Sequence, residues 1–137
     1  MASPAHPPFE ELDFLYVPSA DVAADRDHFV DVLGGRCVFA IDALGTRVAM
    51  VELSAASPRI LLTDHLAGER PILVYRVASL KQATERLVAR GWERPASLEI
   101  PSGPCRSFRT PGGHRLAIYE RTRPEVVEEH FAGRHDF

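Results

Sequence analysis

The sequence predicts an α+β fold in which two βαβββ units form one curved, mostly antiparallel mixed sheet around a central cavity. The chain has 137 residues, which is the size of one ordinary domain. Strand-like runs alternate with two helical patterns, and the order of these elements is the same in both halves. The two halves also align with each other, which indicates an internal repeat whose copies pack together.

The first unit covers about residues 9–66. It begins with a strand at Leu12–Val17, after which Asp21 caps a helix that runs to about Leu33. Gly34-Gly35 ends this helix, because glycine readily adopts the left-handed conformation that follows many helices. Turn residues then separate three strands, which are expected over Cys37–Ile41, Arg47–Leu53 and Arg59–Thr63.

The second unit covers about residues 70–120 and repeats this order. A strand at Ile72–Val77 leads to a helix that Ser79 caps and Gly91 ends. In the alignment of the two units, Phe14 matches Ile72 and Leu61 matches Ala117. The last three strands are expected at about Trp92–Leu98, Arg106–Arg109 and His114–Tyr119, with a sharp turn at Pro111-Gly112-Gly113.

The two ends of the chain differ from this single domain of residues 9–120. Residues 1–8 are rich in proline and small side chains, so we expect a flexible N-terminal lead. Residues 121–137 are expected to form a helical tail, because Pro124 is followed by acidic residues that are typical of a helix start. A short amphipathic helix of this kind should pack on its own domain or on a second subunit.

Composition argues against several classes of protein. The formal net charge of -3 argues against nucleic-acid binding, which needs a clustered basic excess. No apolar run is long enough to span a membrane, and the N-terminal residues lack the features of a secretory signal. The two cysteines, Cys37 and Cys105, are too few for a disulfide framework. We therefore expect a cytoplasmic protein with reduced thiols.

Several short motifs follow one another in the order of a known superfamily. They are Asp21-Val22, His28-Phe29 and Leu33-Gly34 around the first helix, and Thr110-Pro111-Gly112-Gly113-His114 before the last strand. With these motifs, residues 10–120 resemble the vicinal oxygen chelate superfamily, which includes glyoxalase I, extradiol dioxygenases, and fosfomycin- and bleomycin-resistance proteins. Thr110 and Gly112 depart from that superfamily's Asp-Pro-Asp-Gly-Asn turn. The resemblance implies a curved sheet whose concave face holds the ligand or metal.

The resemblance also locates the metal ligands of the metal-dependent members, which are His, Gln or Glu on the first and last strand of each unit. The corresponding positions here are Phe14, Leu61, Ile72 and Ala117. None of these four side chains has a donor atom suited to a divalent cation. We therefore expect neither a metal nor another cofactor at this site.

Other residues with useful chemistry give weaker signals. His65 follows the fourth strand near the rim of the expected cavity, but no spacing among the histidines indicates a metal site. Cys105 is interpreted as a small buried side chain, because the sequence places no base beside it. Glu10, Glu11 and Asp13 are interpreted as solvated charges at the edge of the first strand.

Strand alternation predicts which side chains face the cavity, because residues i and i+2 share a face of a strand. The opposite faces, which include Leu15 and Leu73, are expected to pack under the helices. The predicted ligand-binding residues are Phe14, Tyr16, Leu61, Thr63, Ile72, Val74, Arg76, Ala117 and Tyr119. An apolar floor with Tyr and Arg at its edges suits an apolar or aromatic ligand. A sealed core, or a face covered by a partner, would show the same pattern.

These observations favour a metal-free small-molecule-binding protein of the glyoxalase/bleomycin-resistance type over a metal-dependent enzyme. One alternative is a metal-independent lyase or isomerase that uses Tyr16, Arg76 or Tyr119 for acid–base chemistry. Others are a divalent-metal lyase or dioxygenase with unrecognised ligands, and a structural or regulatory partner domain. A homodimer is also expected, because the resemblance implies units completed across a subunit interface and long strand edges need cover.

Overall fold

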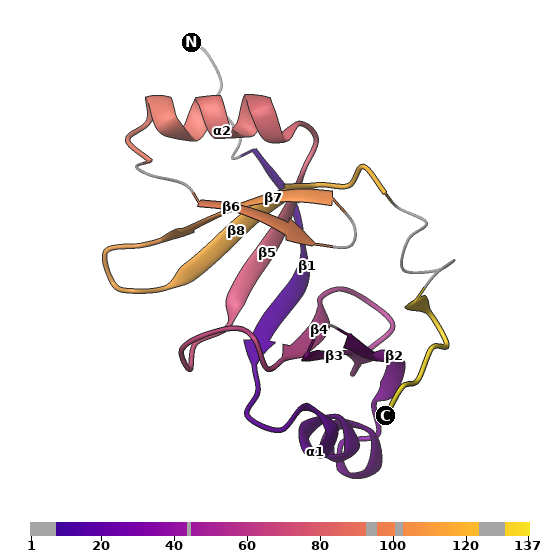
Figure 1. Cartoon of the computed structure of the whole chain (residues 1–137). Coiled ribbons are helices and arrows are strands. Elements are labelled where there is room, and N and C mark those ends of the chain that lie inside the picture. Colours follow the sequence, from indigo (N-terminus) through magenta and orange to yellow (C-terminus); the bar gives the residue numbers. More distant parts are fainter. Residues whose placement is uncertain (1–7, 44, 93–95, 101–102, 124–130) are drawn as a thin grey trace.

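The computed structural model describes residues 8–43, 45–92, 96–100, 103–123 and 131–137. Within these residues, eight strands form one curved mixed sheet with the order β2-β3-β4-β1-β5-β8-β7-β6 (Figure 1). The first unit contains β1 (Phe9–Pro18), α1 (Val22–Asp27), the π-helical turn η1 (His28–Val32), β2 (Arg36–Ala43), β3 (Thr46–Glu52) and β4 (Arg59–Thr63). The second contains β5 (Ile72–Val77), α2 (Leu80–Ala89), β6 (Ala96–Ile100), β7 (Gly103–Arg109) and β8 (Arg115–Glu120). The predicted α+β fold class is confirmed.

The two units pair their strands in the same register, which confirms the internal repeat. In the first unit, Tyr16 lies opposite Leu61 in the parallel pair β1–β4. In the second, Val74 lies opposite Ala117 in the parallel pair β5–β8. The alignment of the two halves makes these pairs equivalent. Antiparallel pairing of β1 with β5, in which Phe14 lies opposite Val74, then joins both units within one chain.

Both α-helices begin at the predicted caps. The Asp21 carboxylate accepts a hydrogen bond from the backbone N–H of Ala24, and the Ser79 hydroxyl accepts one from that of Gln82. The first helix is less regular than its pattern predicts, because its α-helical part ends at Asp27 and a π-helical turn follows. Val32 and Leu33, at the end of that turn, are 67% and 52% exposed.

The helices cover the convex face of the sheet, with α1 on the first unit and α2 on the second (Figure 1). Val22 of α1 packs with Leu62, and Ala83 of α2 packs with Ile118. Leu15 and Leu73 were also expected under the helices, but they are only partly buried and belong to neither helix-side cluster. They lie on β1 and β5, between the areas that the two helices cover. No helix among the described residues is long and apolar enough to cross a membrane.

The C-terminal residues 131–137 lie along the outer edge of β2. The backbone N–H of Gly133 donates to the carbonyl of Val38 at 2.9 Å, and that of Asp136 donates to the carbonyl of Ala40 at 2.7 Å. The ring of Phe137 lies beneath two guanidinium groups of the first unit. The helix expected in the tail lies mostly at 124–130, outside the described residues, as does most of the expected flexible lead at 1–8. The described end of the tail therefore covers a strand edge.

Candidate functional site

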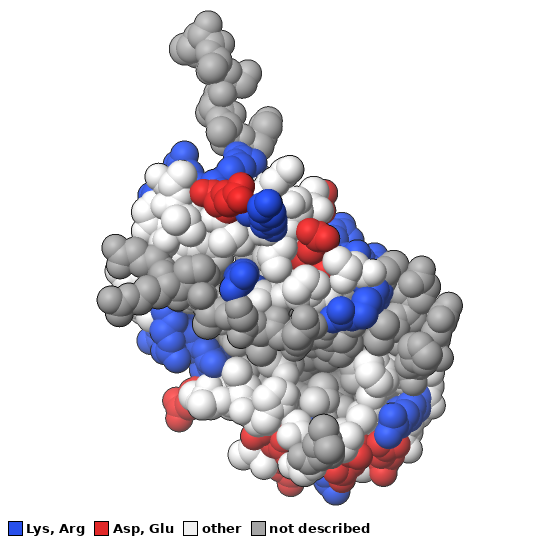
Figure 2. Space-filling view, turned by 45° about the horizontal axis from the view of Figure 1, so that its top comes forward, with Lys and Arg blue, Asp and Glu red and all other residues white. Residues whose placement is uncertain are grey.

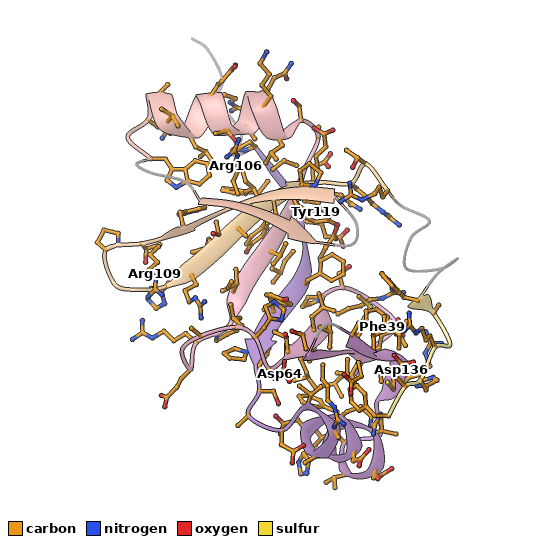
Figure 3. All side chains as sticks on the ribbon, viewed as in Figure 1. Phe39, Asp64, Arg106, Arg109, Tyr119 and Asp136 are labelled. Carbon is orange, nitrogen blue, oxygen red and sulfur yellow. The ribbon has the colours of Figure 1, made fainter. Side chains whose placement is uncertain are left out.

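The concave face brings most of the predicted ligand-binding residues together. Seven of the nine belong to one apolar cluster, and each is at most 9% exposed: Phe14, Tyr16, Leu61, Ile72, Val74, Ala117 and Tyr119. Val38, Phe39, Met50 and Cys105 complete the buried part of the cluster. Figure 3 shows Phe39 and Tyr119 on the two halves of the sheet, with side chains filling the space between them. Leu66 and Phe131, which are only partly buried, pack against the cluster from outside it.

The four positions at which the superfamily resemblance implies metal ligands lie at the centre of this face. Phe14, Leu61, Ile72 and Ala117 belong to the adjacent strands β1, β4, β5 and β8, and all four are in the apolar cluster. Their side chains offer no oxygen or nitrogen, so the donor set does not fit a divalent cation. Among the described residues, no group of three or more His, Cys, Asp or Glu side chains is placed to hold a metal.

A hydrogen-bonded chain of Tyr16, His65 and Thr63 lies at one end of the apolar floor. The hydroxyl oxygen of Tyr16 is 2.7 Å from Nε2 of His65, and the hydroxyl oxygen of Thr63 is 2.5 Å from Nδ1 of the same ring. Burial raises the pKa of Tyr16, and the hydrogen bond with Thr63 partly offsets this effect. His65 itself is exposed. The imidazole therefore bridges the hydroxyl groups of two buried side chains, an arrangement that can accept a proton from one of them.

A second polar group, formed by Tyr119, Asp13 and Arg76, lies at the other end of the floor. The Tyr119 hydroxyl donates to the Asp13 carboxylate, and burial followed by this hydrogen bond raises the pKa of Tyr119. Arg76 lies 3.0 Å from Glu11, 3.6 Å from Glu10 and 3.7 Å from Asp13. Three carboxylates therefore balance the charge of Arg76, which leaves this predicted site residue poorly suited to bind an anionic ligand.

Asp13 corrects one interpretation made from the sequence. Glu10 and Glu11 are exposed, as expected of edge charges, but Asp13 is only 9% exposed. A shift in the β1–β5 register between Leu12 and Phe14 breaks the simple alternation of the strand at this residue. Asp13 therefore lies within reach of Tyr119. Two neighbouring residues, Asp13 and Phe14, are both buried, which strict alternation with one solvated face does not predict.

A cavity of about 300 Å³ lies at the first-unit end of the same face. Its lining is Arg36, Cys37, Val38, Arg59, Ala132, Gly133 and His135. Val38 belongs to the apolar cluster, and Arg59 lies opposite Phe14 in the β1–β4 pair, so the cavity adjoins the floor. The Glu52 carboxylate forms ion pairs with both Arg36 and Arg59. Sequence reasoning missed this cavity because the C-terminal segment forms one of its walls.

Neither cysteine is placed as an activated nucleophile. Burial raises the pKa of Cys37, so the thiol rather than the thiolate predominates at neutral pH. Cys105 is 2% exposed and packs in the apolar cluster, in agreement with its interpretation as a small buried side chain. Figure 2 shows basic and acidic side chains interspersed over the face in view, in keeping with the small net charge of the chain.

Comparison with solved structures identifies the fold. Methylmalonyl-CoA epimerase from Mycobacterium tuberculosis matches with a TM-score of 0.68 and 19% identity, over 89% of this chain and 95% of that one. Catechol 2,3-dioxygenase matches with a TM-score of 0.62 and 19% identity, over 82% of this chain but only 42% of the dioxygenase. A glyoxalase/bleomycin resistance protein/dioxygenase superfamily member from Vibrio splendidus 12B01 matches with a TM-score of 0.54 and 14% identity, over 78% and 95%.

These matches confirm that the chain has the vicinal oxygen chelate fold, as its motifs and internal repeat predicted. At such low identity they establish the fold and not the activity. No protein-family model matches the sequence, and no curated protein matches it.

Proposed function

We propose that this chain, with its vicinal oxygen chelate fold, is a metal-free protein that binds a small apolar or aromatic molecule on its concave face. The observation that carries the proposal is the chemistry of the four central positions. Phe14, Leu61, Ile72 and Ala117 converge on one face where the superfamily resemblance implies metal ligands, and all four are apolar. Such a surface favours burial of an apolar ligand and gives nothing to offset the dehydration of a cation.

The surroundings of the floor support the same proposal. The adjoining cavity of about 300 Å³ is at the lower end of the range for small-molecule sites. Leu66 and Phe131 come from a loop and from the C-terminal segment, and they pack on the floor without belonging to the sheet. An apolar ligand that replaced these two side chains would extend the cavity over the floor. The nine predicted ligand-binding residues, Thr63 and Arg76 included, remain the proposed lining.

A fluorescence titration tests this proposal. N-phenyl-1-naphthylamine, a neutral aromatic probe whose emission rises in apolar surroundings, should bind the wild-type protein. Ile72→Asp places a carboxylate on the floor and should weaken binding of the probe at least about tenfold. The bound probe would leave this charge buried and unpaired, whereas water that hydrates the charge would exclude the probe. Val88→Asp is the control, since Val88 is a 49% exposed residue of α2 on the convex side.

The outcomes separate a ligand site from a sealed core. If the floor is a sealed core, the wild-type protein will not bind the probe, and Ile72→Asp will sharply lower the melting temperature. Ile72→Thr, which introduces a polar hydroxyl group without a charge, supplies the comparison if Ile72→Asp does not fold. Equal probe affinity in the wild type, Ile72→Asp and Ile72→Thr would contradict the proposed site.

A second candidate is a metal-independent lyase or isomerase, and the contacts of His65 favour it. Nε2 of His65 reaches the hydroxyl group of Tyr16, so the imidazole can accept the Tyr16 proton, which leaves a tyrosinate as base, and can return that proton to the same oxygen. The contacts of Tyr119 and Arg76 with carboxylates make these two residues less suitable as acid or base. Deuterium uptake by a bound carbon acid in D2O, measured by mass spectrometry, should be lost in Tyr16→Phe if this candidate is correct.

We also propose a homodimer formed through the convex face, and a cytoplasmic location in keeping with the two free cysteines. Leu15 and Leu73 lie opposite each other on β1 and β5, and Leu73 lies opposite Leu116 on β8. All three are partly exposed and lie near the axis that relates the two units, which suits a symmetric contact. Light scattering should report a dimer that Leu73→Glu dissociates, whereas a wild-type monomer at micromolar concentration would contradict the proposal.

A further inference from the structure

Two arginines face the concave side at the end of the floor near the β7–β8 hairpin. Arg115 of β8 lies directly opposite Arg109 of β7, and on its other side it lies opposite Ile72 of β5. Arg115 is two residues from Ala117, so both side chains point to the concave side. Figure 3 shows Arg109 at the hairpin end of β7, far from Tyr119 along the same pair of strands. The cationic pair of Arg109 and Arg115 therefore lies directly beside the apolar floor.

The guanidinium group of Arg115 is held in place by the loop between β4 and β5. Its Nη1 donates to the backbone carbonyl of Ala67 at 2.7 Å and to that of Arg70 at 2.9 Å. The side chain of Arg70 in turn donates to the carbonyl of Gly112 in the hairpin at 3.0 Å. A Cβ at Gly68 would lie 3.3 Å from Nη1 of Arg115, so glycine there allows the close approach. These contacts fix the direction of the guanidinium before any ligand binds.

Among the described residues, the pair lacks the carboxylate partners that other arginines of the concave face have. Arg36, Arg59 and Arg76 all form ion pairs with glutamates. Within the described part of the chain, neither Arg109 nor Arg115 forms an ion pair, and Nε and Nη2 of Arg115 have no hydrogen-bond partner. Like charges on directly opposite residues destabilise a strand pair. Burial and then the charge of Arg109 lower the pKa of Arg115, as expected for a cation without a counter-charge.

We propose that Arg109 and Arg115 bind an oxyanion, a carboxylate or a phosphate, carried by the apolar molecule that occupies the floor. This inference rests on the proposed function, because the same ligand must reach both places. Ile72 and Arg115 are cross-strand neighbours, so their backbones are only about 5 Å apart and one small molecule spans both. Nε and Nη2 of Arg115, which have no partner among the described residues, form the side of the guanidinium fork that takes a carboxylate in bidentate fashion. The ligand is thus amphipathic and anionic.

A displacement experiment tests the charge preference. N-phenyl-1-naphthylamine, which is neutral, serves as the fluorescent reporter, and the competitors are 2-naphthoate, 2-naphthyl phosphate and the neutral 2-naphthamide. In the wild type the two anions should displace the reporter at concentrations about five- to tenfold lower than the amide does. Arg109→Gln and Arg115→Gln should each reduce that advantage and leave the amide unaffected. Arg90→Gln removes an exposed arginine at the end of α2 and should change nothing.

Each outcome bears on the inference in a distinct way. The stronger of the two anions identifies the ligand as a carboxylate or a phosphate. An amide that competes as well as the anions in the wild type, or an anion advantage that persists in both variants, overturns the inference and leaves the proposed function standing. Failure of the reporter and of all three competitors to bind overturns the proposed function itself. Arg109 is exposed, so Arg109→Gln should fold even if Arg115→Gln, which loses the loop contacts, does not.

Discussion

Tyr119→Phe removes a single hydroxyl group from the buried contact between β8 and β1. Tyr119 is 1% exposed and Asp13 is 9% exposed, so water does not readily replace the lost donor. The nearest remaining charge is that of Arg76, whose Nη1 lies 3.7 Å from the Asp13 carboxylate. The variant therefore leaves a buried carboxylate without its closest hydrogen bond, which is more costly than the loss of a solvent-exposed contact.

The expected loss of unfolding free energy is about 2 kcal/mol, the value typical of a hydrogen bond to a charged group. For a chain of this length it corresponds to a fall in melting temperature of about 8 °C. Urea unfolding and differential scanning calorimetry measure the two quantities. In an Asp13→Asn background the acceptor is neutral, so the same substitution should cost only about 1 kcal/mol, and the difference gives the coupling between the two side chains.

Tyr75→Phe is the matched control for this experiment. The ring of Tyr75 packs beside Phe9 on the convex side, and within the described residues its hydroxyl has no hydrogen-bond partner. Its removal should change stability by less than about 0.5 kcal/mol. If Tyr119→Phe is no more destabilising than Tyr75→Phe, or if the loss is the same with Asn at position 13, the assignment of a buried Tyr119–Asp13 bond is refuted.

Three further predictions concern pH, register and helix capping. The pKa of Tyr119 is higher in the folded chain than in the unfolded one, so the contribution of its protonated hydroxyl to the free energy of unfolding is fully present below about pH 10 and is lost as pH rises above that value. Urea unfolding at a series of pH values should show this fall in stability, and a smaller fall in Tyr119→Phe. A triple variant that restores donor atoms on the floor, with Phe14→His, Ile72→His and Ala117→Glu, should bind Zn²⁺ weakly, as measured by calorimetry. A folded triple variant that binds no Zn²⁺ would contradict the alignment of the two units. Ser79→Ala should lower the free energy of unfolding, measured by chemical denaturation, by about 1 kcal/mol, because the first turn of α2 loses its cap. An unchanged free energy of unfolding would contradict the role of that hydrogen bond.

The sequence predicts the repeated core of this fold well because local signals and tertiary packing agree there. The strands at Arg59–Thr63 and Ile72–Val77 have the expected bounds, and Ser79 caps α2 as its pattern indicates. The later strands are harder to predict. β6 covers Ala96–Ile100 and β7 begins at Gly103, because cross-strand pairing overrides the weak propensity of a segment that contains proline and glycine.

Features that depend on distant residues are those that the sequence does not reveal. Tyr16 and His65 are brought together by the parallel pairing of β1 with β4, and no local sequence pattern predicts their hydrogen bond. The burial of Asp13 results from a register shift, which strand alternation does not predict. The bridge between Ala40 and His135 joins opposite ends of the chain. Alternation does place Arg115 on the concave face, but its pairing with Arg109 requires the β7–β8 register.

We propose that the concave face holds a small apolar molecule without a metal. Native mass spectrometry of gently purified protein, combined with elemental analysis, tests it most directly. We expect a bound organic molecule that is absent from Ile72→Asp, together with less than stoichiometric amounts of any transition metal. A divalent metal at one equivalent per chain in the wild type, lost in parallel with the organic molecule, would contradict it.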